Sequence, residues 1–357
     1  MTLCNEIKVR ATNTLLICLV FLTTGIYSCF AQPAFSSVNY TDANPINRIK
    51  NAGNNIRHIQ GINLEAEATP LQASINSAYH EVKPALAPCG NRLYFSRVNH
   101  PLNTGGISDQ EDIWYSGYDR ETQVWSEPIR LPGFLNNSGP NFVNNVSTTG
   151  DTIILGNRYH KNGKMKAGLS YSVNVRGQWS QPIAITIHDD YNMSQHENRY
   201  VSLKSGVIIS SVQRGDAYGG RDLYVSFWDG THGSQPINMG GVINTEDEES
   251  SPFLADDLKS LYFASKGHNG YGGYDIFVTR RLDDSWTNWS EPENLGPAVN
   301  GIMDDEFFSI SSCGSVATFS KQVNVHNVNL YKISMEDLFF QRKEKKSTGI
   351  ASALASL

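Results

Sequence analysis

The sequence predicts an all-β protein, a five-bladed β-propeller of four-stranded antiparallel blades closed by an N-terminal strand. Two landmarks recur along the chain and keep one period. The proline of a closing segment recurs in steps of 54 to 58 residues, at Pro70, Pro128, Pro182, Pro236 and Pro292. The first residue of a later alternating run recurs in steps of 53 to 56, at Asp112, Gly168, Asp222, Asp275 and Asn329. Short alternating runs that repeat with a constant period and show no helical pattern are typical of propeller blades.

Residues 249–300 are the most regular copy of the repeat. An apolar alternating run at 261–265 is followed by a glycine-rich loop at 267–273 and by a second alternating run at 275–279. A Trp-Ser-x-Pro segment at 289–292 closes the copy. Such a unit forms one small antiparallel sheet that cannot cover both of its faces, so neighbouring copies have to pack against it.

The composition fits a strand-rich, acidic protein. The 357 residues are 39% hydrophobic and 10% aromatic, which is enough to build a core, and the 30 glycines favour turns between strands. The net charge of −6 argues against a nucleic-acid partner, because binding to phosphates requires a basic surface.

The N-terminus has the pattern of a secretory signal peptide at residues 1–31. Lys8 and Arg10 precede an apolar run at 15–22 that is too short to span a bilayer, and small residues follow it. The alternative is a bacterial lipobox in which Cys29 carries a lipid anchor. In either case we expect export to the periplasm, the outer membrane or the medium, with no transmembrane segment after signal removal.

Residues 32–61 are polar and rich in asparagine, and we expect a lead-in there. Five copies follow, at residues 81–128, 141–182, 197–236, 249–292 and 306–340. The first closing segment has no copy before it, so residues 62–72 are predicted to supply the outer strand of the last blade and to close the ring, which removes exposed edges. The propeller therefore spans 62–340, with a tail at 341–357. A sixth blade from residues 33–61 is the alternative.

Three segments of the fourth copy carry a family resemblance: SPFLADDLKSLYFAS at 251–265, GYGGYDIF at 270–277 and WSEPENLG at 289–296. They resemble the WD40-like, TolB-type propeller repeat of bacterial cell-envelope proteins, and the resemblance covers residues 62–340. It implies an exported, non-catalytic module that binds or scaffolds a protein or glycan of the cell envelope. The oligomeric state stays open.

The copies predict a ring of acid–base pairs on one face of the propeller. A carboxylate opens four copies, at Glu81, Glu197, Glu249 and Glu306, and Asn141 opens the second. A base ends the second run of each copy, at Arg97, Arg158, Arg214, Lys266 and Lys321. An asparagine stands five or six residues before each opening position and is predicted to cap the turn between blades, at Asn76, Asn136, Asn192, Asn244 and Asn300.

The start of one antiparallel strand and the end of the next lie at the same edge of a blade. Each base is therefore expected to neutralise its own acid, or the ring as a whole binds a polar ligand. Because Asn141 replaces the carboxylate of its copy, Arg158 lacks a partner and is the candidate for meeting an anionic ligand.

The glycine-rich loops of the same face supply further candidates for ligand binding. With Arg158, these candidates are Tyr159, His160, Tyr218, Tyr271 and Tyr274. Exposed aromatic rings beside hydrogen-bonding groups suit sugar rings or peptides. The alternative is that these tyrosines and glycines only shape tight turns.

Catalytic motifs are scarce. The sequence has no Gly-x-Ser-x-Gly elbow, and we predict no cofactor and no metal site, since the acidic runs at 246–249 and 304–306 lack the spacing of a calcium loop. The alternative function is a carbohydrate-active enzyme, either a polysaccharide lyase or a glycoside hydrolase, with its site on the loop face of the propeller. Its candidate catalytic residues are His188, His196, Glu197 and Arg199.

Two cysteines lie within the predicted propeller. Cys89 and Cys313 occupy equivalent turns of the first and last copies, which become neighbours when the ring closes. Equivalent turns of adjacent blades are expected to lie farther apart than the ~7 Å between Cα atoms that a disulfide permits. We therefore expect two free thiols, with a disulfide as the alternative.

Overall fold

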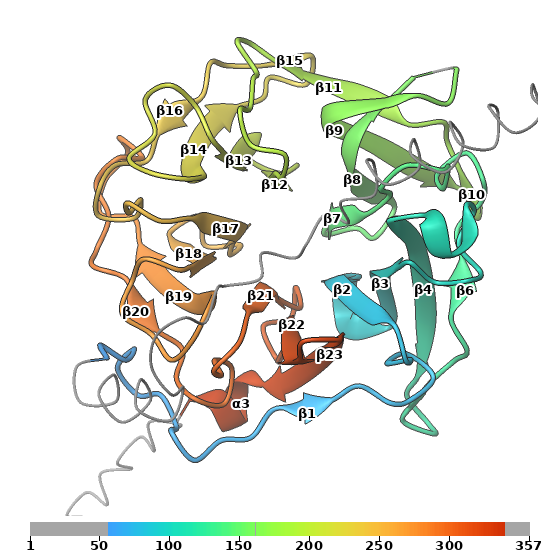
Figure 1. Cartoon of the computed structure of the whole chain (residues 1–357), viewed down its shortest axis with the longest axis horizontal. Helices are drawn as coiled ribbons and strands as arrows, with labels where there is room; N and C mark the ends of the chain where they lie inside the picture. Colours follow the sequence, from blue (N-terminus) through green and yellow to red (C-terminus); the bar gives the residue numbers. More distant parts are fainter. Residues whose placement is uncertain (1–55, 161, 340–357) are drawn as a thin grey trace, which may run out of the picture. The chain divides into compact units, whose positions relative to one another are not determined.

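The computed structural model describes residues 56–160 and 162–339, which form five sheets arranged as the blades of a propeller (Figure 1). The predicted all-β, five-bladed architecture is confirmed. The predicted signal peptide at 1–31, with Cys29, and the tail at 341–357 lie outside the described residues. Within the described residues, no helix is long and apolar enough to cross a bilayer.

The blades follow one another in chain order. The first contains β2 (His80–Leu86), β3 (Arg92–Val98) and β4 (Glu111–Asp119), with β5 (Val124–Trp125) and β6 (Ile129–Arg130) paired to β4. Single 3-10 turns at Pro88–Gly90 and Gly106–Ser108 join its strands. The second contains β7 (Val143–Val146), β8 (Thr152–Tyr159), β9 (Met165–Val175), β10 (Gln178–Trp179) and β11 (Ile183–Ile187).

The third blade contains β12 (Asn198–Ser202), β13 (Val207–Val212), β14 (Asp222–Phe227) and β16 (Ile237–Asn238). The short β15 (His232–Gly233) pairs in parallel with β11 and so links the second and third blades. The fourth contains β17 (Glu249–Leu254), β18 (Ser260–Ser265), β19 (Asp275–Arg280) and β20 (Glu293–Asn294). The fifth contains β21 (Asp305–Ile310), β22 (Val316–Asn324) and β23 (Asn327–Ser334), and α3 (Met335–Leu338) follows it.

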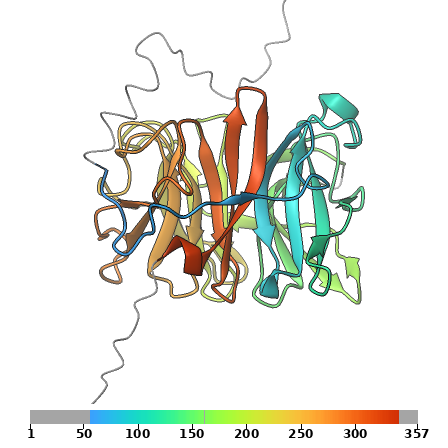
Figure 2. The ribbon, with the colours of Figure 1, turned by 90° about the horizontal axis from the view of Figure 1, so that it is seen from below.

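An N-terminal strand closes the ring as predicted. The strand β1 (Thr69–Pro70) pairs antiparallel with β23 and is the outer strand of the last blade. Figure 2 shows the blue N-terminal segment running along the outside of the red last blade. Just before it, the backbone of Ile59 donates to the carbonyl of Asn294 at 3.2 Å, and Asn294 donates to Arg57 at 2.7 Å. The described part of the predicted lead-in therefore extends the edge of the fourth blade, and the described residues contain no sixth sheet.

The recurring asparagines have a structural role that the turn-cap prediction underestimates. The side chain of Asn244 accepts a hydrogen bond from the backbone N–H of Leu223 at 2.8 Å and donates to the carbonyl of the same residue at 3.1 Å. Asn76, Asn136 and Asn300 make the same pair of bonds to Leu330, Ile113 and Ile276. Each of these amides thus holds the third strand of the preceding blade. In the second blade the longer β11 pairs with that position instead.

The serine of each closing segment holds the other end of the third strand. Ser126, Ser180, Ser234 and Ser290 accept backbone hydrogen bonds from Gly117, Val173, Phe227 and Arg280 at 2.9–3.0 Å. A polar side chain that satisfies a strand end in this way explains why the Trp-Ser-x-Pro segment recurs with the period of the blades.

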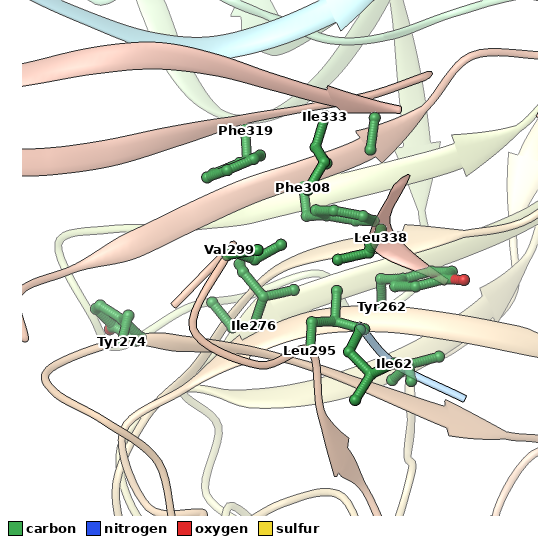
Figure 3. Close-up of a cluster of buried hydrophobic side chains, with 14 residues drawn as sticks. Ile62, Tyr262, Tyr274, Ile276, Leu295, Val299, Phe308, Phe319, Ile333 and Leu338 are labelled. Carbon is green, nitrogen blue, oxygen red and sulfur yellow. The ribbon is translucent and has the colours of Figure 1, made fainter. Parts of the chain in front are cut away.

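The core consists of apolar layers between adjacent blades. Between the fourth and fifth blades, Tyr262 stacks on Phe308 with ring centroids 5.1 Å apart, and Phe319 lies beyond Phe308 (Figure 3). Ile62 from the N-terminal segment and Leu338 from α3 complete this layer. The closure strand is therefore anchored by apolar burial as well as by its hydrogen bonds.

Candidate functional site

Three equivalent residues on the innermost strands have unusual backbone conformations. A β-bulge interrupts β2, β17 and β21, and Lys83, Ser251 and Phe307 lie at these bulges with φ of 55°, 49° and 58°. Positive φ is strained for residues other than glycine, and bulges redirect side chains. Their three strands belong to the five inner strands, β2, β7, β12, β17 and β21, that surround the middle of the ring (Figure 1).

Polar and aromatic side chains gather around these bulges, where the inner strands begin. We name this group the axial cluster: Lys83, Glu111, Phe142, His196, Asn198, Arg221, Glu248, Ser250, Ser251, Glu306 and Phe307. Every blade contributes to it, and contacts between blades connect its members.

The cation of Lys83 is fully engaged in the cluster. Its Nζ donates to both carboxylate oxygens of Glu111 at 2.6 Å. The same atom lies 3.8 Å from the ring centroid of Phe142 and 5.7 Å from that of Phe307. Lys83 therefore joins the first, second and fifth blades through an ion pair and cation–π contacts.

The carboxyl group of Glu306 is held by hydroxyls rather than by a cation. Its Oε1 accepts hydrogen bonds from Ser250 Oγ at 2.8 Å and Ser251 Oγ at 3.1 Å, and Asn198 Nδ2 donates to Ser250 Oγ at 2.8 Å. Burial raises the pKa of Glu306, and the neighbouring charge of Asp304 adds to this effect. A carboxyl group in these surroundings favours its protonated form.

A second carboxylate of the cluster has the opposite electrostatics. Arg221 Nη2 donates to Tyr274 Oη at 2.6 Å and to Glu248 Oε2 at 3.2 Å, and Tyr274 Oη also donates to Glu248. Burial by itself would raise the pKa of Glu248, but Arg221, Tyr274 and Lys266 together hold this pKa below its ordinary value. Glu248 is therefore ionised at neutral pH.

The side chain of His196 is exposed beside these groups. Burial of part of the ring lowers the pKa of His196, and the charges of Arg221 and Lys83 lower it further. At neutral pH the imidazole is therefore uncharged and able both to donate and to accept a hydrogen bond.

Arg158 has a carboxylate partner, so the prediction that it lacks one is wrong. Its Nη2 lies 3.0 Å from Asp190 Oδ2, in the segment between the second and third blades. Asp190 also binds Arg199 at 2.8 Å, and Arg199 binds Glu197 at 3.0 Å. The side chain of Arg199 is only 3% exposed. Spacing within one copy did not reveal Asp190, because it comes from the connection to the next blade.

The predicted ring of acid–base pairs exists only in part. Glu81 pairs with Arg97 at 3.3 Å, as predicted. In the last blade Lys321 pairs with Asp305 at 3.2 Å, one residue before the predicted Glu306.

The other bases use carboxylates of neighbouring segments. Lys266 lies 3.8 Å from Glu248, whereas the predicted partner Glu249 is held by the backbone N–H of Thr245 and by hydroxyls. Arg214 pairs with Asp189 at 3.0 Å instead of Glu197.

The predicted aromatic ligands differ in their exposure. Tyr218 is 58% exposed and His160 is exposed, as expected for loop side chains. Tyr274 is 4% exposed, so its assignment to an exposed loop surface is wrong. Tyr159 Oη donates to the carbonyl of Leu135 at 3.0 Å and is half-buried, and Tyr271 Oη bonds His58 Nε2 at 2.8 Å.

The four candidate catalytic residues have different surroundings. Glu197 and Arg199 are in contact, and His196 lies at the axial cluster. His188 instead follows the outer strand β11, and its backbone N–H donates to the carbonyl of Gly233 at 2.9 Å. The described residues include no group of three or more His, Cys, Asp or Glu side chains placed to bind a metal ion. Cys313 is an exposed free thiol.

Comparisons with known proteins identify the fold. No protein-family model and no curated protein matches the chain. Among solved structures, a glycoside hydrolase has a TM-score of 0.52 at 8% identity, over 82% of this chain and 96% of that one. The α-L-arabinofuranosidase PaAbf62A from Podospora anserina, in complex with cellotriose, has a TM-score of 0.50 at 11% identity, over 77% and 98%.

TolB from Acinetobacter baumannii has a TM-score of 0.42 at 12% identity, over 74% of this chain and 54% of that one. The chain thus spans about half the length of that protein. At these identities the likenesses show a five-bladed β-propeller and nothing finer.

Proposed function

We propose that this protein is an exported, non-catalytic propeller that binds a saccharide of the cell envelope through its axial cluster. The observation that carries the proposal is the convergence of Lys83, Ser251 and Phe307, three strained bulge residues, on one set of hydrogen-bonding groups and aromatic rings. Backbone strain of this kind accumulates at functional sites.

The chemistry of the cluster suits a polyhydroxylated ligand. The carboxyl of Glu306 and the neutral ring of His196 are donors and acceptors for sugar hydroxyls, and Phe307 supplies an apolar face. The hydroxyls of Ser250 and Ser251 are buried and hold the carboxyl of Glu306 in place. A few polar groups beside aromatic surface are typical of small-ligand sites. The solved structure with cellotriose is a saccharide complex on a similar fold, and the TolB-type resemblance of the repeat supports an envelope location.

Binding without turnover fits the pairing of the carboxylates. Hydrolysis of a glycoside uses two carboxyl groups that flank the scissile bond. Both oxygens of Glu111 are held by Lys83, and Glu248 is held by Arg221 and Tyr274. These two groups are neutralised by their partners, which leaves Glu306 as the carboxyl of the cluster bound by hydroxyls.

A glycoside hydrolase is the second candidate, and one observation favours it. The surroundings push the pKa of Glu306 up and that of Glu248 down, and both groups interact with Arg221. A carboxyl pair with separated pKa values is the arrangement of a general acid and its ionised partner. The glycosidases among the similar structures agree with this candidate.

One experiment separates the two candidates. The chain from residue 32 is titrated by calorimetry with cello-, arabino- and galacturono-oligosaccharides, and reducing ends are assayed on the same mixtures. We expect binding without new reducing ends, and binding roughly tenfold or more weaker in Glu306→Ala and Ser251→Ala. Glu293→Gln, a glutamate exchange at the outer edge of the fourth blade, is the matched control that keeps full affinity.

The results of this experiment distinguish the hydrolase from the binding module and test the axial site. New reducing ends that disappear in Glu306→Ala establish the hydrolase in place of the binding module. Failure of every saccharide to bind the folded protein, or binding in which neither the affinity nor the number of sites changes in the Glu306 and Ser251 variants, overturns the axial site.

A further inference from the structure

A cavity lies between the first and second blades, away from the axial cluster. It has a volume of about 540 Å³, within the range of small-ligand sites. Its walls include the start of β3, the turn at Thr149–Asp151 and the turn between β9 and β10. These turns join strands at the opposite end of the blades from the glycine-rich loops, because antiparallel connections alternate between the two ends. The cavity is therefore separate from the proposed saccharide site.

One wall of the cavity contains a tryptophan whose equivalents in other blades have different surroundings. The closing segments place Trp125, Trp179 and Trp289 at equivalent positions. Trp125 and Trp289 are 8% and 3% exposed and belong to the apolar layers between their own blade and the preceding one. Trp179 is half-exposed and lines the cavity, with its ring 6.2 Å from that of Tyr94 in the preceding blade. The tryptophan of the closing segment is thus buried in the first and fourth blades, whereas in the second blade it faces a cavity.

A cation also distinguishes this interface from the others. The first residue of the second strand is Arg92 here, whereas the equivalent residues are uncharged: Thr152, Val207, Ser260 and Val316. The exposed Arg92 lies over the ring of Tyr115, with 5.3 Å between the guanidinium carbon and the ring centroid, and Nη1 donates to Tyr94 Oη at 3.3 Å. These contacts hold the guanidinium at the cavity wall.

Hydrogen-bonding groups of the second blade also line the cavity. The carboxylate of Asp151 accepts from Thr149 Oγ1 at 2.6 Å and from Thr152 Oγ1 at 2.9 Å. Asn174 also lines the cavity and fixes the adjoining turn by accepting from the backbone of Gly177 at 2.9 Å. The cavity is therefore lined by aromatic rings together with a fixed acceptor and an amide.

We propose that this cavity is a binding site for a short saccharide, which stacks on Trp179 and Tyr115 and is oriented by Arg92 and Asp151. Aromatic faces with fixed polar groups at the rim suit a sugar ring, which has apolar faces and hydroxyl edges. A peptide fits less well, because peptide recognition commonly uses a strand edge or an apolar groove, whereas side chains of both charges line this cavity. The site is independent of the axial cluster.

The test uses saturation-transfer NMR and calorimetry on the chain from residue 32 carrying Glu306→Ala, so that the axial cluster does not contribute to binding. The probes are cello- and galacturono-oligosaccharides, with short peptides as the contrasting ligand. We expect binding that Trp179→Ala weakens by roughly tenfold or more. Arg92→Gln, at an exposed side chain whose loss leaves the core intact, weakens galacturono-oligosaccharides more than cello-oligosaccharides if the guanidinium binds a carboxylate. Equal weakening of both means that it binds hydroxyls, and either result supports the site.

A control variant and the Glu306→Ala background make the outcome specific. Tyr218→Ala removes an exposed aromatic ring on the loop face and should change nothing. Binding in the Glu306→Ala background cannot come from the axial cluster, so the failure of one saccharide site is distinguishable from failure of the other. The proposal is wrong if Trp179→Ala and Arg92→Gln both keep full affinity for every saccharide. It is equally wrong if only peptides, and no saccharides, bind in a manner that depends on Trp179.

Discussion

Replacing Asn244 by alanine should lower the free energy of unfolding by about 3 kcal/mol. The side chain is 2% exposed and holds both backbone groups of Leu223, which is fully buried in β14. Truncation leaves the N–H of Leu223 without its acceptor, and an unpaired buried group costs about 1–3 kcal/mol. The carbonyl of Leu223 keeps its bond from the backbone of Met239, so its loss amounts to one ordinary hydrogen bond of about 1 kcal/mol.

The natural control is Asn192, which stands at the same repeat position but contacts no third strand. Its side chain is half-exposed and bonds Ser194, His196 and Gln213 within a surface turn, where water can replace it. Asn192→Ala should cost less than about 1 kcal/mol. Urea unfolding followed by tryptophan fluorescence measures both variants, with stability compared at equal slope. Equal losses in the two variants, or a loss below 1 kcal/mol for Asn244→Ala, would refute the role of the amide as a strand clamp.

Three further predictions concern buried ionisable groups. Burial raises the pKa of Glu249 to about 7, so stability should fall as pH rises from 4.5 towards 7, and Glu249→Gln should flatten this profile in urea titrations. A profile unchanged by the substitution contradicts it. Burial lowers the pKa of His58, so acidification below pH 6.5 should release the N-terminal segment. The hydrogen-exchange protection factor of the Ile59 amide should fall there, and His58→Phe should abolish that loss of protection. Tyr274→Phe should lower stability by about 1 kcal/mol, because Arg221 loses a buried acceptor, and an unchanged urea midpoint would show that this hydroxyl is dispensable.

The residues that recur with a constant period in the sequence predicted most of the fold. The recurring prolines and third-strand residues correctly gave the number of blades, and the orphan closing segment correctly placed β1 beside β23. Both depend on local patterns, since turn chemistry and alternation repeat with each blade. The position of the ring of asparagines was also visible in the sequence, although their bonds to the preceding blade were not.

The candidate site was predicted less well, because its contacts cross between blades. Glu111, Arg221 and Glu248 were not selected from the sequence. Arg221 and Glu248 meet only across the boundary between the third and fourth blades, and Glu111 binds Lys83 beside the rings of two other blades. Tyr274 looked like a loop aromatic but is buried against Arg221. Lys83, Ser251 and Phe307 stand at equivalent positions of the repeat, and this equivalence could have pointed to the site. It becomes informative only when the bulges and their positive φ are known.

The sequence by itself determined the repeating unit, the number of blades and the way the ring closes, because each follows from alternation and turn residues that act over short distances. The tertiary structure alone decided which charges meet. Lys266 binds Glu248 rather than Glu249, and Arg158 binds Asp190 from the next connection. Long charged side chains reach across blade boundaries, and their partners depend on burial and on the register between blades, which a one-dimensional period does not contain.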